Sequence, residues 1–488
     1  MKISSLSKAL GSGWPAVLAL PLFAAGAARA AEPAIVLTHV QIVDVVADKI
    51  EPDRTVVVRN GKIAEVRRAH PADENQPGSV LVDASGKYLI PGLWDMHAHI
   101  RDPEREFSLL IANGVLGIRD MGGDPEKIFR WREQVASGAL QGPRIVACGP
   151  IVDGPEPSNP PISVVVRDAL EGRAIVGKLK MMGADCVKVH DRVPLDAYRA
   201  IAEEARNWDL PLVGHIPVRV PTMEAAMAGQ RSIEHQIGLR GASLAEREVM
   251  EAEAKEDVVA EAMKTGNFSL IPEAIARKGN LLLDRFDSRR ALDLYRAFVK
   301  NGTYLDPTLV TQYALTFVDE LSRREDPRMK YIPAAEREYW KPEKGMLTRY
   351  RTPAYIAYRK REFTKTLEQI PIAQRAGVSF VAGTDMWLPY VYPGFSTHDE
   401  MALFVQAGLS PIEALRTATL NPARLLGLES STGSIRKGKA ADLVLLAADP
   451  LKDIANTKKI AAVILHGKLL RRADLDAMLQ AAETAAGK

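Results

Sequence analysis

The sequence predicts an α/β fold in which a (β/α)8 TIM-like barrel is joined to a small β-sandwich domain built from both ends of the chain. Three observations favour this class. Between residues 91 and 430, short apolar runs alternate with stretches rich in Ala, Glu, Arg and Leu, and eight such units can be counted. Residues 35–89 and the chain beyond Gly433 instead consist of short β-branched runs separated by turns. The total of 488 residues exceeds one ordinary domain.

The first thirty residues are typical of a secretory signal peptide. Two lysines precede a largely apolar stretch (residues 14–27) that is short for a membrane span, and the sequence ARA at 28–30 fits a cleavage site. An uncleaved anchor is the alternative. Removal of residues 1–30 takes away three basic and no acidic residues, so basic residues fall from 64 to 61 and equal the 61 acidic residues. We therefore expect an exported protein, in a bacterial periplasm, that binds neither nucleic acid nor a membrane after cleavage.

Changes in the sequence pattern along the chain predict its division into domains. The connection between residues 311 and 374 is too long for a plain barrel loop and is rich in basic and aromatic residues, so it predicts a helical insertion over the barrel mouth. The predicted parts are the signal peptide (1–30), the N-terminal part of the small β domain (31–90), the barrel (91–430) and the C-terminal part of the β domain (431–488). Asn60-Gly61 predicts a hairpin in the first β part.

Eight apolar runs predict the barrel strands. They are the run ending at His99, then 114–120, 143–149, 185–190, 210–216, 231–235, 302–309 and 378–385. Side chains alternate along a strand, so His97 and His99 face the same way, into the barrel and near its C-terminal end. Two neutral imidazoles in that place form half of a metal site, although a surface histidine pair is the alternative.

Later strands end in further residues that can bind a metal. Lys188, His215, His235 and Asp385 occupy these ends, and four of the nine histidines of the chain lie at strand ends. In a parallel barrel the C-terminal ends of all strands meet at one face, where active sites form. The sequence therefore predicts a cluster of ligands at that face.

The ordered segments PGLWDMHAH, GADCVKV, VGHIP, SIEH and AGTD, followed by TLNPARLLGLESSTGSIRKGKAADLVLL, resemble the amidohydrolase superfamily over nearly the whole mature chain. Within it, the chain is similar to the imidazolonepropionase-like branch, which also contains exported metal-dependent dipeptidases. The resemblance implies two divalent metal ions, with zinc expected. It implies that His97, His99 and Asp385 hold a buried ion and that His215 and His235 hold an outer one.

The resemblance also implies that Lys188 bridges the two ions as an N6-carboxylated lysine. A free ammonium cannot ligate a cation, whereas a carbamate is an anionic oxygen donor. A salt-bridged lysine of the barrel is the alternative. Imidazolonepropionase itself is similar but lacks this lysine and uses one metal, so Lys188 argues against that activity.

A site of this kind implies a hydrolase. Two close cations lower the pKa of a bridging water and give a hydroxide, while Asp385 accepts a proton and delivers it to the leaving group. The leading hypothesis is hydrolysis of an amide bond in a small molecule, a dipeptide or an N-acyl amino acid. One alternative is a lactone, urea, carbamate or phosphotriester hydrolase that uses the same site. An inactive metal-binding scaffold is a remote alternative because no ligand is missing. The substrate, the metal and the oligomeric state, including a homo-oligomer, stay open.

Two other polar residues near strand ends are substrate candidates. Arg119 ends the second strand, where it could hold a substrate carboxylate or form a structural pair with Asp120. His190 follows Lys188 by two residues and should face inward, either as a substrate contact or as a histidine of the rim.

The remaining expectations concern structural roles. Asp95 belongs to the DxHxH pattern and either supports the metal ligands or is a plain carboxylate at the strand entry. Cys148 and Cys186 lie on neighbouring predicted strands, and we expect two buried thiols rather than a disulfide. His398 and Glu400 match a helix start after the last strand in the family, and the sequence assigns them no chemistry.

Overall fold

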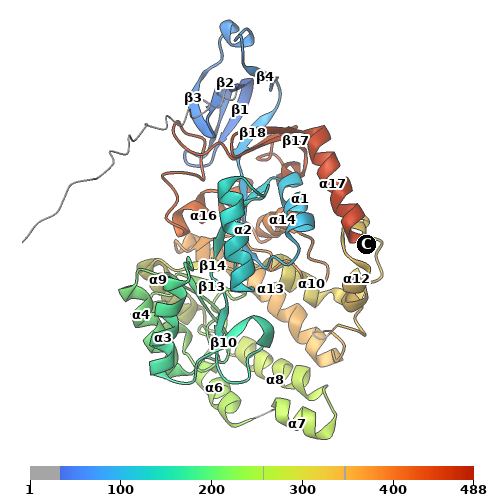
Figure 1. Ribbon diagram of the computed structural model, residues 1–488. Coiled ribbons are helices and arrows are strands. Elements are labelled where there is room, and N and C mark those ends of the chain that lie inside the picture. Colours follow the sequence, from blue (N-terminus) through green and yellow to red (C-terminus); the bar gives the residue numbers. More distant parts are fainter. Residues whose placement is uncertain (1–32, 257, 346–347, 488) are drawn as a thin grey trace, which may run out of the picture. The chain divides into compact units, whose positions relative to one another are not determined.

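The computed structural model describes residues 33–487 except 257 and 346–347, so the predicted signal peptide lies outside the described residues. Strands from both ends of this part form one eight-stranded sheet in the order β18-β17-β16-β5-β1-β2-β3, with β4 paired to β1. These strands are β1 (Ile35–Asp44), β2 (Lys49–Arg59), β3 (Lys62–Arg68), β4 (Val80–Asp83), β5 (Tyr88–Pro91), β16 (Leu443–Leu446), β17 (Ile460–Leu465) and β18 (Lys468–Arg471). Figure 1 shows the blue N-terminal strands beside the red C-terminal ones.

One apolar core holds the two halves of this sheet together. Leu37 and Ile42 of β1 share it with Leu443 of β16 and Ile464 of β17. The junction is the antiparallel pairing of β16 with β5, in which Val444 lies opposite Ile90. The predicted β domain built from both chain ends is therefore confirmed.

The predicted hairpin at Asn60-Gly61 joins β2 to β3, because Arg59 pairs with Lys62 across it. Both turn residues have positive φ, 50° and 72°. Asn and Gly are the residues that adopt this backbone at least cost.

The eight barrel strands follow the predicted order. They are β6 (Leu93–Ala98), β7 (Val115–Asp120), β8 (Arg144–Ala147), β11 (Val187–Val189), β12 (Leu212–Gly214), β13 (Ser232–Glu234), β14 (Tyr304–Asp306) and β15 (Ser379–Phe380). All pairings among them are parallel. The ring closes where the amide of Met96 donates to the carbonyl of Ala382 at 2.9 Å and the amide of Asp385 donates to that of His97 at 2.7 Å.

The third strand of the barrel, β8, ends at Ala147. The chain resumes as β9 (Ile151–Asp153), which pairs with β11 through Val152 and Val189 and with the short β10 (Ser163–Val165). Between β8 and β11 the amide of Asp185 donates to the carbonyl of Ala147 at 2.8 Å. The boundary between β8 and β11, called the seam below, is thus closed by fewer strand pairings than the rest of the ring.

A disulfide between Cys148 and Cys186 spans the seam, so the expectation of two free thiols was wrong. The two Cα atoms lie 4.6 Å apart, within the separation that a disulfide bridges. Both residues are buried and pack against Met121 and Val213 inside the barrel. The sequence placed the cysteines on neighbouring strands but could not give their register, which decides whether the sulfur atoms meet.

Helices alternate with the strands and cover the outside of the barrel. After β6, β7, β8, β11 and β12 the chain forms α1 (Pro103–Ala112), α2 (Pro125–Ser137), α3 (Ala169–Met181), α4 (Leu195–Asn207) and α5 (Thr222–Met227). Local signals fix their ends. In α2, Asp124 accepts from the amides of the first turn, Pro125 starts the helix, and Gly138 ends it with φ of 76°.

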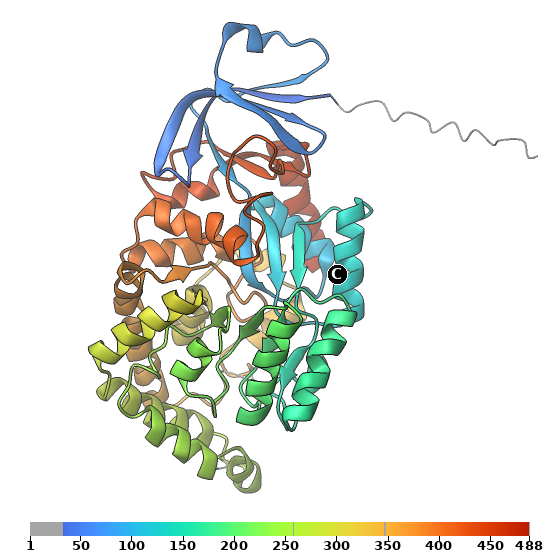
Figure 2. The same cartoon turned by 90° about the vertical axis from the view of Figure 1, so that its left-hand side faces the viewer.

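The later connections are longer and carry additional helices. After β13 come α6 (Glu246–Lys255), α7 (Val258–Thr265), α8 (Leu270–Asp284) and α9 (Ser288–Asn301); after β14 come α10 (Leu309–Thr316), α11 (Val318–Leu321), α12 (Ala334–Trp340) and α13 (Pro353–Arg375). The sequence predicted the helical insertion after β14 but not the one after β13. Figure 2 shows the helices after β13 in yellow-green.

The last strand leads into the C-terminal helices. They are α14 (Phe395–Gln406), α15 (Pro411–Thr417), α16 (Leu420–Leu425) and, after the small sheet, α17 (Arg472–Ala486). α17 packs on α1. Within the described part of the chain, no helix combines the length and hydropathy needed to cross a bilayer.

Candidate metal centre

The strand ends bring all six predicted ligands to one face of the barrel. They are His97 in β6, His99 just after it, Lys188 in β11, His215 after β12, His235 after β13 and Asp385 after β15. All six line one cavity.

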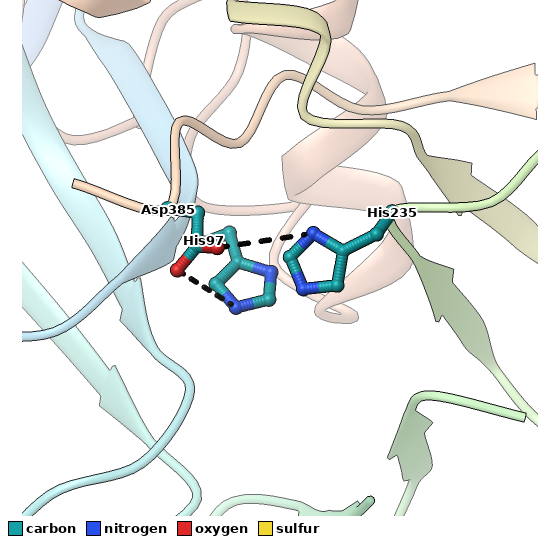
Figure 3. A group of neighbouring side chains, drawn as sticks. All are labelled: His97, His235 and Asp385. Atoms are coloured by element: carbon teal, nitrogen blue, oxygen red, sulfur yellow. Dashed lines mark ion pairs between the residues drawn. The ribbon is translucent and has the colours of Figure 1, made fainter. Parts of the chain in front are cut away.

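The predicted ligands of the buried ion surround the carboxylate of Asp385. Its Oδ1 lies 3.3 Å from Nε2 of His99 and 3.7 Å from Nε2 of His97. Nζ of Lys188 approaches the same nitrogen of His97 at 3.5 Å. Figure 3 shows the carboxylate of Asp385 next to the rings of His97 and His235.

The predicted ligands of the outer ion continue the cluster without a gap. The ring of His235 lies 4.6 Å from that of His97 and 4.8 Å from that of His215, measured between ring centres. One ligand atom from each of His97, His235 and Asp385 falls within 4.8 Å of the others. The structure thus brings together residues that are far apart in the sequence. Asp385 follows His97 by 288 positions.

Each of the four imidazoles uses Nδ1 for a partner outside the cluster. These contacts are His97 to Glu234 Oε2 at 3.1 Å, His99 to the carbonyl of Gly122 at 2.7 Å, His215 to Asp191 Oδ1 at 2.8 Å and His235 to Thr308 Oγ1 at 2.8 Å. Histidines that bind metals in proteins are oriented in this way, through the nitrogen that does not bind the ion. The arrangement leaves four Nε2 atoms for a ligand and so fits a metal centre.

Burial favours the protonation states that such a centre requires. It lowers the pKa of His215 to about 4 and that of His235 to about 3, and it holds the pKa of His97 well below its ordinary value. Neutral imidazole is the form that binds a metal. Burial also lowers the pKa of Lys188, which disfavours the ammonium form that could neither ligate a cation nor be carboxylated.

Asp385 is ionised and held in a strained turn. Burial alone would raise its pKa, but the hydrogen bond with His99 keeps it below the ordinary range. Its φ is 55°, and that of His235 is 62°. Such backbone costs about 1–3 kcal/mol per residue and is concentrated at functional sites. Asp95 fixes the turn, because it accepts from the amide of Thr384 at 2.9 Å and from its hydroxyl at 2.6 Å.

The amidohydrolase family profile matches residues 88–470, which include the barrel strands and the predicted ligands. The chain belongs to the amidohydrolase family. A dihydroorotase from Pelotomaculum thermopropionicum is 25% identical over 438 residues, which cover 88% of this chain and 93% of that protein. A dihydroorotase from Syntrophobacter fumaroxidans is 29% identical over 195 residues, which cover 35% of this chain and 39% of that protein.

Solved structures show the same fold. A bottromycin amidohydrolase superposes with a TM-score of 0.69 at 22% identity, covering 93% of this chain and 90% of the other. A Xaa-Pro dipeptidase with methionine bound in its active site superposes with a TM-score of 0.63 at 20% identity, covering 90% and 100%.

Arg119 of this amidohydrolase lies beneath the centre and not in the cavity. Its guanidinium donates to the hydroxyl of Ser232 at 2.7 Å, to Glu234 at 3.0 Å and to Asp306 at 3.4 Å, and its side chain is 1% exposed. The prediction that it holds a substrate carboxylate was therefore wrong, and so was the pairing with Asp120. Carboxylates on two later strands attract the cation into the barrel interior, where no substrate reaches it.

Glu234 is the residue in this network that sequence reasoning missed. Its carboxylate binds Arg119 and also accepts from Nδ1 of His97, so it connects the buried cation to a metal ligand. The sequence pattern carried no signal for it, because alternation along a strand places Glu234 and the adjacent His235 on opposite faces, and His235 was expected to face the cavity. Arg119 fills the space between Glu234, His97 and Asp306, which would otherwise be a third group of possible ligands.

Replacement of Glu234 with Gln is expected to weaken zinc binding by about 10- to 100-fold, as is usual when the outer partner of a metal-binding histidine is changed. The amide keeps the shape but loses the charge that orients His97. Competition with a chromogenic chelator measures the affinity. Glu246→Gln is the control, since Glu246 is also buried and accepts from Thr222 away from the cavity. An equal loss in both variants would show that Glu234 contributes only to stability.

His190 lines the cavity. This agrees with the prediction that its side chain faces inward. Its ring lies 4.0 Å from that of His215. Its Nδ1 approaches Asp153 at 3.3 Å and makes no hydrogen bond within the described residues. A role as a substrate contact remains a prediction.

His398 and Glu400 have structural partners away from the cavity. His398 contacts Thr457 at 2.9 Å and the carbonyl of Asn113 at 3.0 Å. Glu400 accepts from the amides of Leu309 and Val310 and so caps the N-terminus of α10. Neither residue touches the predicted ligands.

The cavity above the centre has a volume of about 730 Å³, within the range of about 300–1,000 Å³ that is usual for small-molecule sites. Its walls come from the strand ends, from α8, α10 and α13, and from Trp387. The Trp387 ring is edge-on to His99 at 6.1 Å and is covered by the guanidinium of Arg101 at 3.2 Å. The helices that follow β13 and β14 thus shape the space in which a substrate would lie.

Proposed function

We propose that this chain is an exported hydrolase that uses two divalent metal ions to cleave an amide bond in a dipeptide or an N-acyl amino acid. The observation that carries the proposal is the set of four imidazoles, each oriented through Nδ1, around Lys188 and an ionised Asp385. This donor set suits zinc, because imidazole and carboxylate oxygen are its usual ligands in catalytic sites.

The roles proposed for the residues follow their positions. His97, His99 and Asp385 hold the buried ion, while His215 and His235 hold the outer ion. Lys188, as an N6-carboxylysine, would supply an anionic oxygen ligand to both ions. Bound in this way, the ions would supply Lewis-acid activation of the substrate carbonyl and of a water molecule. Asp385 accepts the proton of the attacking water and passes it to the leaving nitrogen.

Several findings support the finer parts of the proposal. The Xaa-Pro dipeptidase and the bottromycin amidohydrolase bear names of enzymes that act on amide bonds, and both share this fold. The disulfide between Cys148 and Cys186 favours export, since such bonds form and persist in oxidising compartments. The signal-like segment at residues 1–30 points the same way.

A substrate panel tests the bond type. Dipeptides, N-acyl amino acids, lactones, ureas, carbamates and phosphotriesters are offered to the zinc-loaded protein, and then to protein treated with a chelator. We expect metal-dependent turnover of the dipeptides or N-acyl amino acids. Preferred turnover of a lactone or a phosphotriester would replace amide hydrolysis with the alternative activity, and no turnover of any compound would favour an inactive scaffold.

The purified protein is expected to contain close to two divalent ions per chain, with zinc predominant, because the cluster offers two adjacent ligand sets. Elemental analysis measures the ions. Labelling with ¹³C-bicarbonate followed by ¹³C NMR detects the carbamate carbon on Lys188. One ion per chain together with an unmodified lysine would contradict the two-ion centre.

A further inference from the structure

The cavity contains three Lys or Arg side chains within the described part of the chain, namely Lys188, Arg240 and Arg359. Lys188 belongs to the centre itself. The guanidinium of Arg240 is engaged by the protein, since it donates to the carbonyl of Val220 at 2.5 Å and approaches the hydroxyl of Thr222 at 3.4 Å. These contacts leave Arg359 as the cation in the cavity wall that is available to a ligand.

Arg359, in α13, has an unused hydrogen-bonding edge. Its Nη1 pairs with Glu362 at 2.8 Å. Its Nε is shielded from solvent and has no hydrogen-bond partner among the described residues. A buried N–H without an acceptor is unfavourable, and native proteins rarely leave one unpaired. An acceptor supplied by a ligand would satisfy it.

The guanidinium of Arg359 is held in place by packing between two helices. Gly279 of α8 lies so close to Tyr358 that a Cβ atom there would be 2.1 Å from the tyrosine ring. The Tyr358 hydroxyl donates to Glu362 at 2.5 Å, and Glu362 in turn binds Arg359. The free edge therefore has a fixed position before any ligand arrives, which reduces the cost of binding.

Apolar side chains line the cavity together with this cation. Ile275, Leu282 and Leu283 from α8 and Leu315 from α10 line the same cavity as Arg359. An available cation that shares the cavity with these apolar residues suits a ligand that combines one anionic group with an apolar group.

We propose that Arg359 binds the α-carboxylate of the substrate, and that the substrates are N-acyl-α-amino acids, dipeptides included, with a free carboxylate beside an apolar side chain. The inference rests on the proposed amide hydrolysis. The edge formed by Nε and Nη2 matches the two oxygens of a carboxylate and gives two parallel hydrogen bonds. The α8 and α10 residues then contact the side chain of the carboxylate-bearing residue, and the scissile amide faces the metal centre.

The test compares paired substrates that differ only in this carboxylate, N-acetyl-L-leucine and N-acetyl-L-leucinamide. We expect the wild-type protein to favour the acid by about 10- to 100-fold in kcat/KM, mainly through KM, as is usual for a hydrogen bond to a charged group. Arg359→Met should bring the ratio close to one. Arg361→Met is the matched control, because Arg361 lies on the same helix, pairs with Asp284 at 2.7 Å and does not line the cavity.

Equilibrium binding separates failure of this inference from failure of the proposed function. Calorimetry with the metal-loaded protein uses N-benzyl-L-leucine and N-benzyl-L-leucinol, which contain no amide bond. Tighter binding of the acid by at least tenfold, lost in Arg359→Met, supports the carboxylate site even if no amide is hydrolysed. Equal binding of the two compounds, or a preference that Arg359→Met retains, overturns it. In the single variant Glu362 loses its cationic partner, which could impair folding. The double variant Arg359→Met/Glu362→Gln removes that unpaired charge and should give the same binding result.

Discussion

Asp385→Asn is expected to abolish most turnover, with a loss of about 100- to 10,000-fold, while the fold and part of the metal content remain. The amide oxygen can still ligate weakly, but it cannot accept a proton. The backbone should tolerate the change, since Asn adopts the left-handed region more readily than most residues and φ at this position is 55°. Steady-state kinetics, elemental analysis and thermal melting measure the three properties.

Asp44→Asn is the control for the loss of a buried carboxylate. Asp44 belongs to the small sheet, is buried and pairs with Arg436 at 2.6 Å, so its replacement should lower stability without reducing turnover. If Asp385→Asn retained activity within a factor of a few of wild type, another group would have to move the proton.

Lys188→Ala is expected to lose the bridge between the ions, the affinity for metal and the activity together. The side chain is almost completely buried, so its removal leaves a cavity that a small carboxylate can enter. Added formate, acetate or propionate should therefore restore part of the turnover and of the bound metal. Lys188→Met should not respond, because the methionine side chain fills the same space.

Retention of both ions and most of the activity by Lys188→Ala, with no added acid, would show that Lys188 is not a ligand. The centre would then contain a single ion held by His97, His99, Asp385 and one of the two later histidines. Imidazolone-type chemistry would in that case compete again with amide hydrolysis.

The clustering of the ligands could be predicted because it depends on simple geometry. Alternation along a strand directs His97 and His99 to one side, and parallel strands end at one face of a barrel. The partners of these ligands could not be predicted in the same way. Glu234 reaches His97 across 137 residues, and its choice of partner depends on where Arg119 inserts.

The errors share a physical cause, since each depends on how elements far apart in the sequence pack together. Arg119 was predicted either to hold a substrate carboxylate or to pair with Asp120, but acidic residues on β13 and β14 neutralise it inside the barrel. Arg359 could not be singled out from the sequence, because its environment is made by the packing of α13 on α8.

The disulfide of the barrel seam also constrains the order of events during folding. Cys148 and Cys186 are excluded from solvent in the finished barrel, so an oxidant reaches their sulfur atoms only before the strands close around them. Chain that folds in a reducing cytosol would enclose two separate thiols, one of them two residues before Lys188, and later transfer to an oxidising buffer would not join them. The history of a preparation, and not only its final conditions, thus decides whether β8 and β11 are covalently linked beneath the metal centre.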